Sequence, residues 1–304
     1  MASKIARVIL IEFEGFVRCD VKLPDLGLSL EDRIMLVEKV NTVFHVAVTV
    51  TFKQPLDDAV NTNTKGTSGV IDLCKELKQI ISFIYVSTSY NNGYLSEIEE
   101  KVYTTSWELC TVINICDKQD KNSIALLEES ILKTHPNTYS FSKNLADQIV
   151  FNHCKSFPSA VVRPSIIGAS LKKPCPDWVD NVYGPTGVGL QIGKGNAKVL
   201  RAKRDTRLNL VSVDYVIDTI LCGIISAQED KAFAGEQDHA SQHQFYCTFI
   251  ITISGSKVRN MERTLNINLG NLSEDSLHQQ SAIATTAIDG SRKSENAGSA
   301  AVGD

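Results

Sequence analysis

Short apolar runs rich in β-branched residues recur along the chain, and amphipathic stretches separate them. The runs predict buried parallel strands at 40–50, 81–90 and 159–167, with 6–13 a weaker candidate. Helical spacing of apolar residues predicts helices at 28–40, 56–77, 137–155 and 213–227. Because strands alternate with helices, we expect an α/β fold, a doubly wound parallel sheet covered by helices on both faces.

The helix at 28–40 has the clearest start. Ser29 is a typical N-cap residue, since its side-chain oxygen can accept a hydrogen bond from a free N–H group of the first turn. Apolar residues follow at helical spacing, namely Leu30, Ile34, Val37 and Val40.

Composition narrows the class of protein. A chain of 304 residues with 43% hydrophobic and 22% charged residues is typical of a globular protein. A net charge of −4 gives no electrostatic reason to expect nucleic acid as a partner. The eight cysteines include no CxxC pair, which favours free thiols in a reducing compartment. The N-terminus does not resemble a signal peptide, and the apolar run at 245–253 is too short to span a bilayer. We therefore expect an intracellular protein without a transmembrane segment.

The stretch NTYSFSKNLADQ, residues 137–148, places Tyr139 and Lys143 four residues apart in a predicted helix. This spacing puts both side chains on one helix face. An ammonium beside a phenol favours the phenolate, so we expect Lys143 to lower the pKa of Tyr139 and create a proton donor suited to carbonyl chemistry. Composition alone produces such a pair about as often as not, so the pair needs further support.

That support comes from Thr88, which closes the predicted strand ISFIYVST. Ligands of parallel α/β sheets bind at the carboxyl ends of strands, where a hydroxyl, a phenol and a cation together would stabilise charge developing on a carbonyl oxygen. Thr88 alone would more often be a strand-end cap. With Tyr139 and Lys143 nearby, the functional interpretation is favoured.

Two other signals are weaker. Asp238, His239 and His243 include two imidazoles at helical spacing, but no further ligand lies near them, so a solvated loop is favoured over a metal site by roughly ten to one. Trp178 would line a channel for an apolar substrate or anchor a loop in the core, and the first alternative is slightly favoured.

The order of VSTSY (86–90) and NTYSFSK (137–143) resembles the extended short-chain dehydrogenase/reductase superfamily. Eight further stretches in register resemble its alcohol-forming fatty acyl-CoA reductases over about residues 14–225. They are DLGLSLEDR (25–33), VFHVAVTVTF (43–52), NTNTKGT (61–67), YVSTSYNNGY (85–94), VVRPSII (161–167), DWVDNVYGPTG (177–187), GKG (193–195) and VSVDYVID (211–218).

The resemblance implies roles for the three candidate catalytic residues. Tyr139 would give a proton to the substrate carbonyl, and Lys143 would lower the pKa of Tyr139 and bind the nicotinamide ribose. Thr88 would hold the carbonyl oxygen, with Ser87 as the less favoured hydroxyl. NADPH would supply hydride to a long-chain fatty acyl-CoA, CoA would leave, and a second hydride would reduce the aldehyde to the fatty alcohol.

The resemblance also implies a set of cofactor-binding residues. Asp20 would contact the adenine amino group, and the segment 45–48 would pass along the cofactor. Residues 163–166 would approach the nicotinamide. With the catalytic pair, the set is Asp20, His45, Ala47, Tyr139, Lys143, Pro164 and Ile166. Family members associate with peroxisomal or endoplasmic reticulum membranes, and peripheral association stays open for this chain.

The chain departs from the family pattern at its start. The family's first strand leads into a glycine-rich turn that receives the pyrophosphate at a helix N-terminus, and no GxxGxxG precedes VNTVFHVAV here. The glycines at 186–195 follow the Tyr139 helix and resemble a substrate-side loop instead. We expect the family's first strand, first helix and second strand to be missing. In the sheet of this chain, the edge of the family's fourth strand would then be exposed. Residues 6–13 would be able to fill one place in the sheet.

Three domains are therefore expected. Residues 1–228 would form an N-terminally incomplete Rossmann-like NAD(P)-binding and catalytic domain, and 229–272 a divergent extension. Residues 273–304 are small, polar and aperiodic, which predicts a disordered tail.

Two alternatives to the acyl-CoA reductase remain. One is a truncated or non-catalytic relative that binds its cofactor poorly, which the missing phosphate loop favours. The other is a superfamily cousin acting on sterols or nucleotide sugars, which the LGLS, WVDN and GKG stretches argue against.

Overall fold

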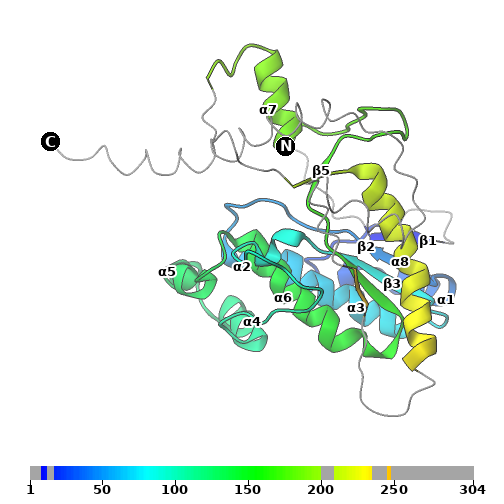
Figure 1. Ribbon diagram of the computed structural model, residues 1–304. Coiled ribbons are helices and arrows are strands. Elements are labelled where there is room, and N and C mark those ends of the chain that lie inside the picture. Colours follow the sequence, from blue (N-terminus) through cyan, green and yellow to red (C-terminus); the bar gives the residue numbers. More distant parts are fainter. Residues whose placement is uncertain (1–7, 12–16, 200–208, 235–244, 248–304) are drawn as a thin grey trace. The chain divides into compact units, whose positions relative to one another are not determined.

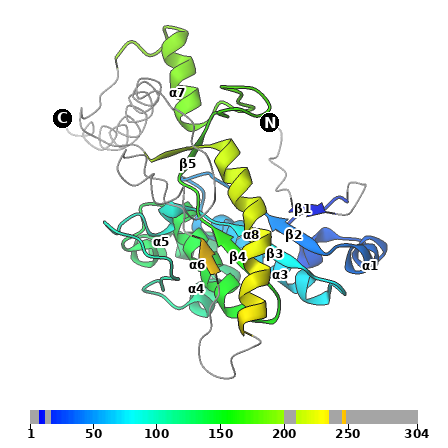
Figure 2. The same ribbon diagram turned by 45° about the vertical axis from the view of Figure 1, so that its right-hand side comes forward.

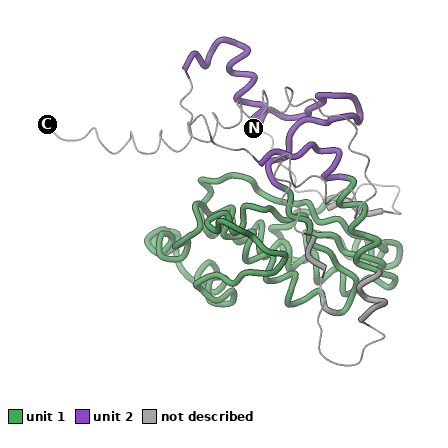
Figure 3. Tube along the Cα trace, in the orientation of Figure 1, with its two compact units in different colours: residues 1–164, 218–249 green, residues 165–217, 250–304 purple. Residues whose placement is uncertain are grey.

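The structure is a computed structural model that describes residues 8–11, 17–199, 209–234 and 245–247 (Figure 1). The chain divides into two units, one built from 1–164 and 218–249 and the other from 165–217 and 250–304 (Figure 3). Each unit is described by itself. The predicted tail at 273–304 lies outside the described residues, as does most of 229–272, so the three expected domains stay a prediction.

A five-stranded sheet forms the centre of the first unit, in the order β1-β2-β3-β4-β7. The strands are β1 (Val8–Ile11), β2 (Thr42–His45), β3 (Ser82–Val86), β4 (Ser159–Val162) and β7 (Phe245–Cys247). β2, β3, β4 and β7 run parallel to one another. The three apolar runs therefore form the parallel strands that the sequence predicts.

β1 changes one expectation. It pairs antiparallel with β2, with Val8 opposite His45 and Ile11 opposite Thr42. The edge of β2, which was expected to be exposed, is thus covered by the weaker strand candidate. A strand in this direction satisfies the backbone donors and acceptors of the edge as well as a parallel one would.

The predicted helices are all present. They are α1 (Leu30–Lys39), α2 (Leu56–Ala59) continuing through a π-helical turn (Val60–Lys65) into α3 (Gly66–Glu76), α6 (Thr138–His153) and α8 (Val213–Ala234). Three helices were not predicted: α4 (Leu109–Lys118), α5 (Lys121–Leu132) and α7 (Gly184–Gly193).

Helices cover both faces of the sheet. Phe83 and Tyr85 of β3 belong to one core cluster with apolar residues of α3 and α6. Ile84 points to the opposite face, where its Cδ1 lies 3.4 Å from the position that a Cβ on Gly223 of α8 would take. The part of α8 after residue 217 crosses this face in front of β3 and β4 (Figure 2). The doubly wound α/β class is confirmed.

The start of α1 is as predicted, but its buried face is not. The Ser29 side chain accepts a hydrogen bond from the Asp32 N–H group at 3.0 Å. Leu36 and Val40 are buried, whereas Leu30 and Ile34 are 76% and 55% exposed. The buried face of α1 therefore differs from the predicted one. Leu36, which is not among the four apolar residues of the predicted face, packs into the core.

The second unit contains a parallel pair, β5 (Ile166–Gly168) and β6 (Leu210–Ser212). Asp214, in the first turn of α8, accepts hydrogen bonds from the N–H groups of Leu171, Lys172 and Lys173 at 2.7–3.2 Å. The glycine-rich stretch 186–195 lies mostly in α7 of this unit. Among the described residues, no helix is both long and apolar enough to cross a membrane.

Candidate active site

The carboxyl end of β3 carries the first candidate residue. Thr88 follows the strand by two residues, is 5% exposed, and caps the 3₁₀ turn Ser89–Asn92 by accepting the Tyr90 N–H group at 3.2 Å. Its side chain also lies close enough to the phenol of Tyr139 to lower the pKa of that phenol. Thr88 is therefore both the strand-end cap that its position suggests and a neighbour of the candidate proton donor.

Tyr139 lies in the first turn of α6, which Asn137 begins by accepting the Ser140 N–H group at 2.9 Å. Its ring packs 5.6 Å from that of Phe52. Burial raises the pKa of Tyr139, the nearby Thr88 side chain opposes this, and the charge of Asp147 adds to it. The expected lowering of the pKa of Tyr139 is thus wrong for this structure.

Lys143 explains the difference. It is 1% exposed, its Nζ donates to the Val86 carbonyl oxygen at 2.8 Å, and Nζ lies 4.2 Å from the centre of the Tyr85 ring. Burial lowers the pKa of Lys143 to about 7, against an opposing effect of Asp147. An amine that is only about half protonated near pH 7 and donates to a carbonyl oxygen stabilises a neighbouring phenolate less than a fully charged ammonium would.

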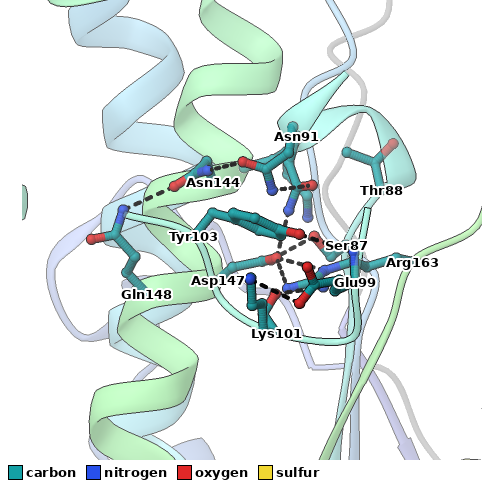
Figure 4. Close-up of polar contacts among 12 residues, drawn as sticks. Ser87, Thr88, Asn91, Glu99, Lys101, Tyr103, Asn144, Asp147, Gln148 and Arg163 are labelled. Carbon is teal, nitrogen blue, oxygen red and sulfur yellow. Dashed lines mark hydrogen bonds and ion pairs between the residues drawn. The ribbon is translucent and has the colours of Figure 1, made fainter. Parts of the chain in front are cut away.

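A buried carboxylate, Asp147, lies one turn beyond Lys143 on α6 (Figure 4). Its oxygens accept hydrogen bonds from the Ser87 hydroxyl and the Asn91 side-chain amide, both at 2.5 Å. Nε and Nη2 of Arg163 lie 2.9 and 2.7 Å from its Oδ2. Ser87, the less favoured candidate hydroxyl, is therefore engaged with Asp147.

A row of side-chain amides extends from this carboxylate along α6. Asn92 donates to Asn91 at 3.0 Å, Asn144 donates to Asn92 at 2.7 Å, and Gln148 donates to Asn144 at 2.9 Å. All four side chains are buried. The row joins two successive turns of α6 to the 3₁₀ turn after Thr88.

Asp147 and its amide partners were not predicted from the sequence. A signal was present, because Asn144, Asp147 and Gln148 place polar groups on one side of a helix that is otherwise rich in apolar residues. Polar side chains repeated at helical spacing within a core helix need buried partners.

The structure brings His45 and Ala47 close to the end of β2 and buries both, at 1% and 4% exposure. His45 Nε2 lies 2.9 Å from the Thr67 hydroxyl, and its Nδ1 has no hydrogen-bond partner. Burial, followed by the charge of Lys143, lowers the pKa of His45 to about 3, so the ring is neutral.

The other three predicted cofactor residues lie in different surroundings. Asp20 is exposed in a turn, where its carboxylate accepts the Lys22 N–H group at 2.9 Å. The Pro164 carbonyl oxygen accepts the Ser89 N–H group at 3.0 Å, which joins it to the turn after Thr88. Ile166 begins β5 in the second unit. Asp238, His239 and His243 lie outside the described residues.

An NAD-binding family model described as male sterility protein matches residues 14–220. The chain belongs to this family. The match begins before Asp20 and ends after β6, so it includes Thr88, Tyr139 and Lys143.

Curated proteins that are similar to this chain are named fatty acyl-CoA reductases. Fatty acyl-CoA reductase 1 of Xenopus laevis is 35% identical over 67% of the chain and 40% of its own length. Fatty acyl-CoA reductase wat of Drosophila melanogaster is 33% identical over 70% of the chain and 41% of its own length. The chain thus spans about two fifths of the length of the curated relatives it matches.

Among solved structures, the terminal R domain from the myxalamid PKS-NRPS biosynthetic pathway is similar at a TM-score of 0.47. It is 21% identical, and the match covers 67% of this chain and 45% of that one.

Proposed function

We propose that this chain reduces long-chain fatty acyl-CoA to the fatty alcohol through an aldehyde, with NADPH as the reductant. One observation carries the proposal. The Tyr139 phenol lies within reach of the Thr88 side chain, which follows β3, on the same helix as the buried Lys143. Membership of an NAD-binding family and relatives named fatty acyl-CoA reductases support it further.

The chemistry of the side chains at the end of β3 fits one end of a nicotinamide cofactor. Two hydroxyls and an amine suit a ribose and a reducible carbonyl, which present oxygens as hydrogen-bond partners. Fewer groups suit the charged pyrophosphate in the middle of the cofactor. Between residues 17 and 41 the only glycine is Gly27, where a phosphate-binding turn of this fold needs several.

In the proposed mechanism, Tyr139, Lys143 and Thr88 position the carbonyl and handle the proton. A bound reduced nicotinamide supplies hydride. As the carbonyl oxygen of the thioester gains negative charge, the Thr88 hydroxyl donates a hydrogen bond to it and Tyr139 donates its proton. The raised pKa of Tyr139 keeps the phenol protonated until that charge appears.

Collapse of the first adduct breaks the carbon–sulfur bond, and CoA leaves as a thiol, which yields the aldehyde. Tyr139, reprotonated from solvent, then donates a proton to the aldehyde oxygen as a second reduced nicotinamide supplies hydride, which gives the alcohol. Lys143 would bind the nicotinamide ribose with the N–H groups of its amine, while its contact with the Val86 carbonyl oxygen holds the amine in place.

A second candidate function is a relative with weak cofactor binding. The antiparallel β1 supports it, because β1 occupies the place beside β2 where the family has the parallel strand that leads into the phosphate-binding turn. Asp20, the residue proposed for the adenine, is exposed in a turn.

Incubation of the full chain with hexadecanoyl-CoA and excess NADPH, followed by mass spectrometry of extracted lipids, tests the proposal. We expect fatty alcohol from the wild type and from the control variant Asp117→Asn, and less from parallel reactions with NADH. Saturable binding of NADPH and acyl-CoA without any alcohol would contradict the proposed reaction. Absence of NADPH binding would favour the second candidate.

A further inference from the structure

We infer that Asp147, held by Arg163, positions the segment that carries Thr88 against the helix that carries Tyr139 and Lys143. The inference rests on the proposed function, because it assigns these two residues a task in the proposed reaction. Asp147 and Arg163 would act through Thr88 and Tyr139, as positioning residues.

The contacts of Asp147 fall on both sides of Thr88. Ser87 precedes Thr88 and donates to Oδ1, and Asn91 follows it by three residues and donates to Oδ2. Asp147 itself lies on α6, two turns beyond Tyr139. One carboxylate therefore joins the end of β3 and the 3₁₀ turn to the proposed catalytic helix (Figure 4).

Arg163 fixes the carboxylate from a third element. It directly follows β4 and is fully buried. Besides its two contacts with Asp147, it donates from Nη1 to the Lys101 carbonyl oxygen at 3.1 Å. The next residue, Pro164, accepts the N–H group of Ser89 at 3.0 Å. The end of β4 thus supports both Asp147 and the turn that Asp147 holds.

Folding alone does not require such a pair. Burial of two charges carries a desolvation cost that often cancels their attraction, so apolar residues of similar volume would stabilise a core equally well. A buried pair does specify one geometry, because any displacement leaves a charge without its partner. The geometry specified here is the distance between Thr88 and α6, on which the approach of Thr88 to the Tyr139 phenol depends.

His135 supports the same turn from another direction. Its ring packs 5.1 Å from that of Tyr94 and 5.2 Å from that of Phe141. The segment that follows the turn therefore packs against His135, while Asn91 itself is held to Asp147 by its side chain. This side-chain contact can be removed separately.

Amide hydrogen exchange of the full chain, followed by NMR or mass spectrometry, tests the inference without any need for activity. The variants are Asp147→Asn and the milder Asn91→Ala, which leaves the ion pair intact. Matched controls are Asp117→Asn, in an exposed ion pair with Lys65, and Asn122→Ala, on the exposed start of α5. We expect exchange at Ser89 and Gly93 to accelerate about tenfold or more in both test variants and to stay unchanged in the controls.

A merely structural role predicts a different result. It would accelerate exchange throughout β2, β3 and α6 together with the turn, in proportion to the lost stability. That result for Asn91→Ala, or unchanged exchange at Ser89 and Gly93, would overturn the inference. If Asp147→Asn does not fold, Asn91→Ala decides the question alone. A chain without acyl-CoA reductase activity would refute the proposed function but leave the exchange pattern as predicted.

Discussion

The two places where a nicotinamide cofactor would be held are built differently. At the proposed nicotinamide end, Lys143 is 1% exposed and donates to the Val86 carbonyl oxygen, and Ser87 beside Thr88 donates to Asp147 of α6. At the proposed adenine end, Asp20 is exposed, and its only side-chain hydrogen bond among the described residues is to the Lys22 N–H group. The first end is fixed by buried polar contacts between elements, and the second by a local turn.

The turn around Asp20 nevertheless has one long-range anchor. A Cβ on Gly66, at the start of α3, would lie 2.9 Å from the Cβ of Val21 and 3.1 Å from its carbonyl oxygen. The backbone of α3 therefore approaches the chain next to Asp20 more closely than any other residue type would permit. Packing places Asp20, whereas a polar network places Tyr139 and Lys143.

The largest effect is expected for Tyr139→Phe. Tyr139 is the proposed proton donor to the substrate carbonyl, so alcohol formation should fall by about 10²–10⁴-fold. The fold should survive, because phenylalanine keeps the ring that packs against Phe52. Product analysis under excess NADPH measures the effect, and near-normal turnover would remove Tyr139 from the mechanism.

Lys143→Met should make the protein more stable, and the gain should depend on pH. The pKa of Lys143 falls from 10.5 to about 7 on folding, so the folded state binds fewer protons between these values. The cost of burying the amine is therefore complete below about pH 7 and disappears as the pH rises towards 10.5. Replacement by methionine should raise the free energy of unfolding by about 2–4 kcal/mol at pH 6.5 and by much less near pH 10.

Urea denaturation at several pH values checks this prediction, because all other ionisable groups are shared by the two proteins. A gain that stays constant with pH, or one that grows as the pH rises, would show that Lys143 is charged in the folded protein throughout this range.

Gly66→Ala should have a smaller effect, concentrated at the adenine end. The added methyl group would displace Val21, and such overpacking costs about 1–3 kcal/mol. Gly69→Ala is the control, because its Cβ would meet only the end of the flexible Leu26 side chain, at 3.1 Å. Thermal unfolding compares the two variants. Equal melting temperatures would mean that the approach of α3 to Val21 does not determine the position of the Asp20 turn.

The sequence predicted most of the parallel sheet, because its strands are continuous apolar runs buried on both faces. It also predicted the helix of Tyr139 and the Ser29 cap of α1, since both follow from local patterns. The hydroxyl pair of Thr88 and Tyr139 followed from topology, because carboxyl ends of parallel strands form one edge where ligands bind.

Features that depend on distant partners were not predicted. The direction of β1 depends on the free edge of β2, which no local pattern reports. The lowered pKa of Lys143 and the raised pKa of Tyr139 depend mainly on burial by other elements, which the sequence does not report. Asp147 stood in the same quoted stretch as Lys143, but its partners Ser87, Asn91 and Arg163 are distant in sequence.

Titration of the full chain with fragments of the cofactor compares the two ends most directly. Reduced nicotinamide mononucleotide carries the end proposed for Tyr139 and Lys143, and adenosine 2′,5′-bisphosphate carries the end proposed for Asp20. We predict that the nicotinamide fragment binds within about tenfold of intact NADPH, that Lys143→Ala weakens it, and that the adenine fragment binds far more weakly. Tight binding of the adenine fragment, together with no binding of the nicotinamide fragment, would contradict a nicotinamide site at the end of β3.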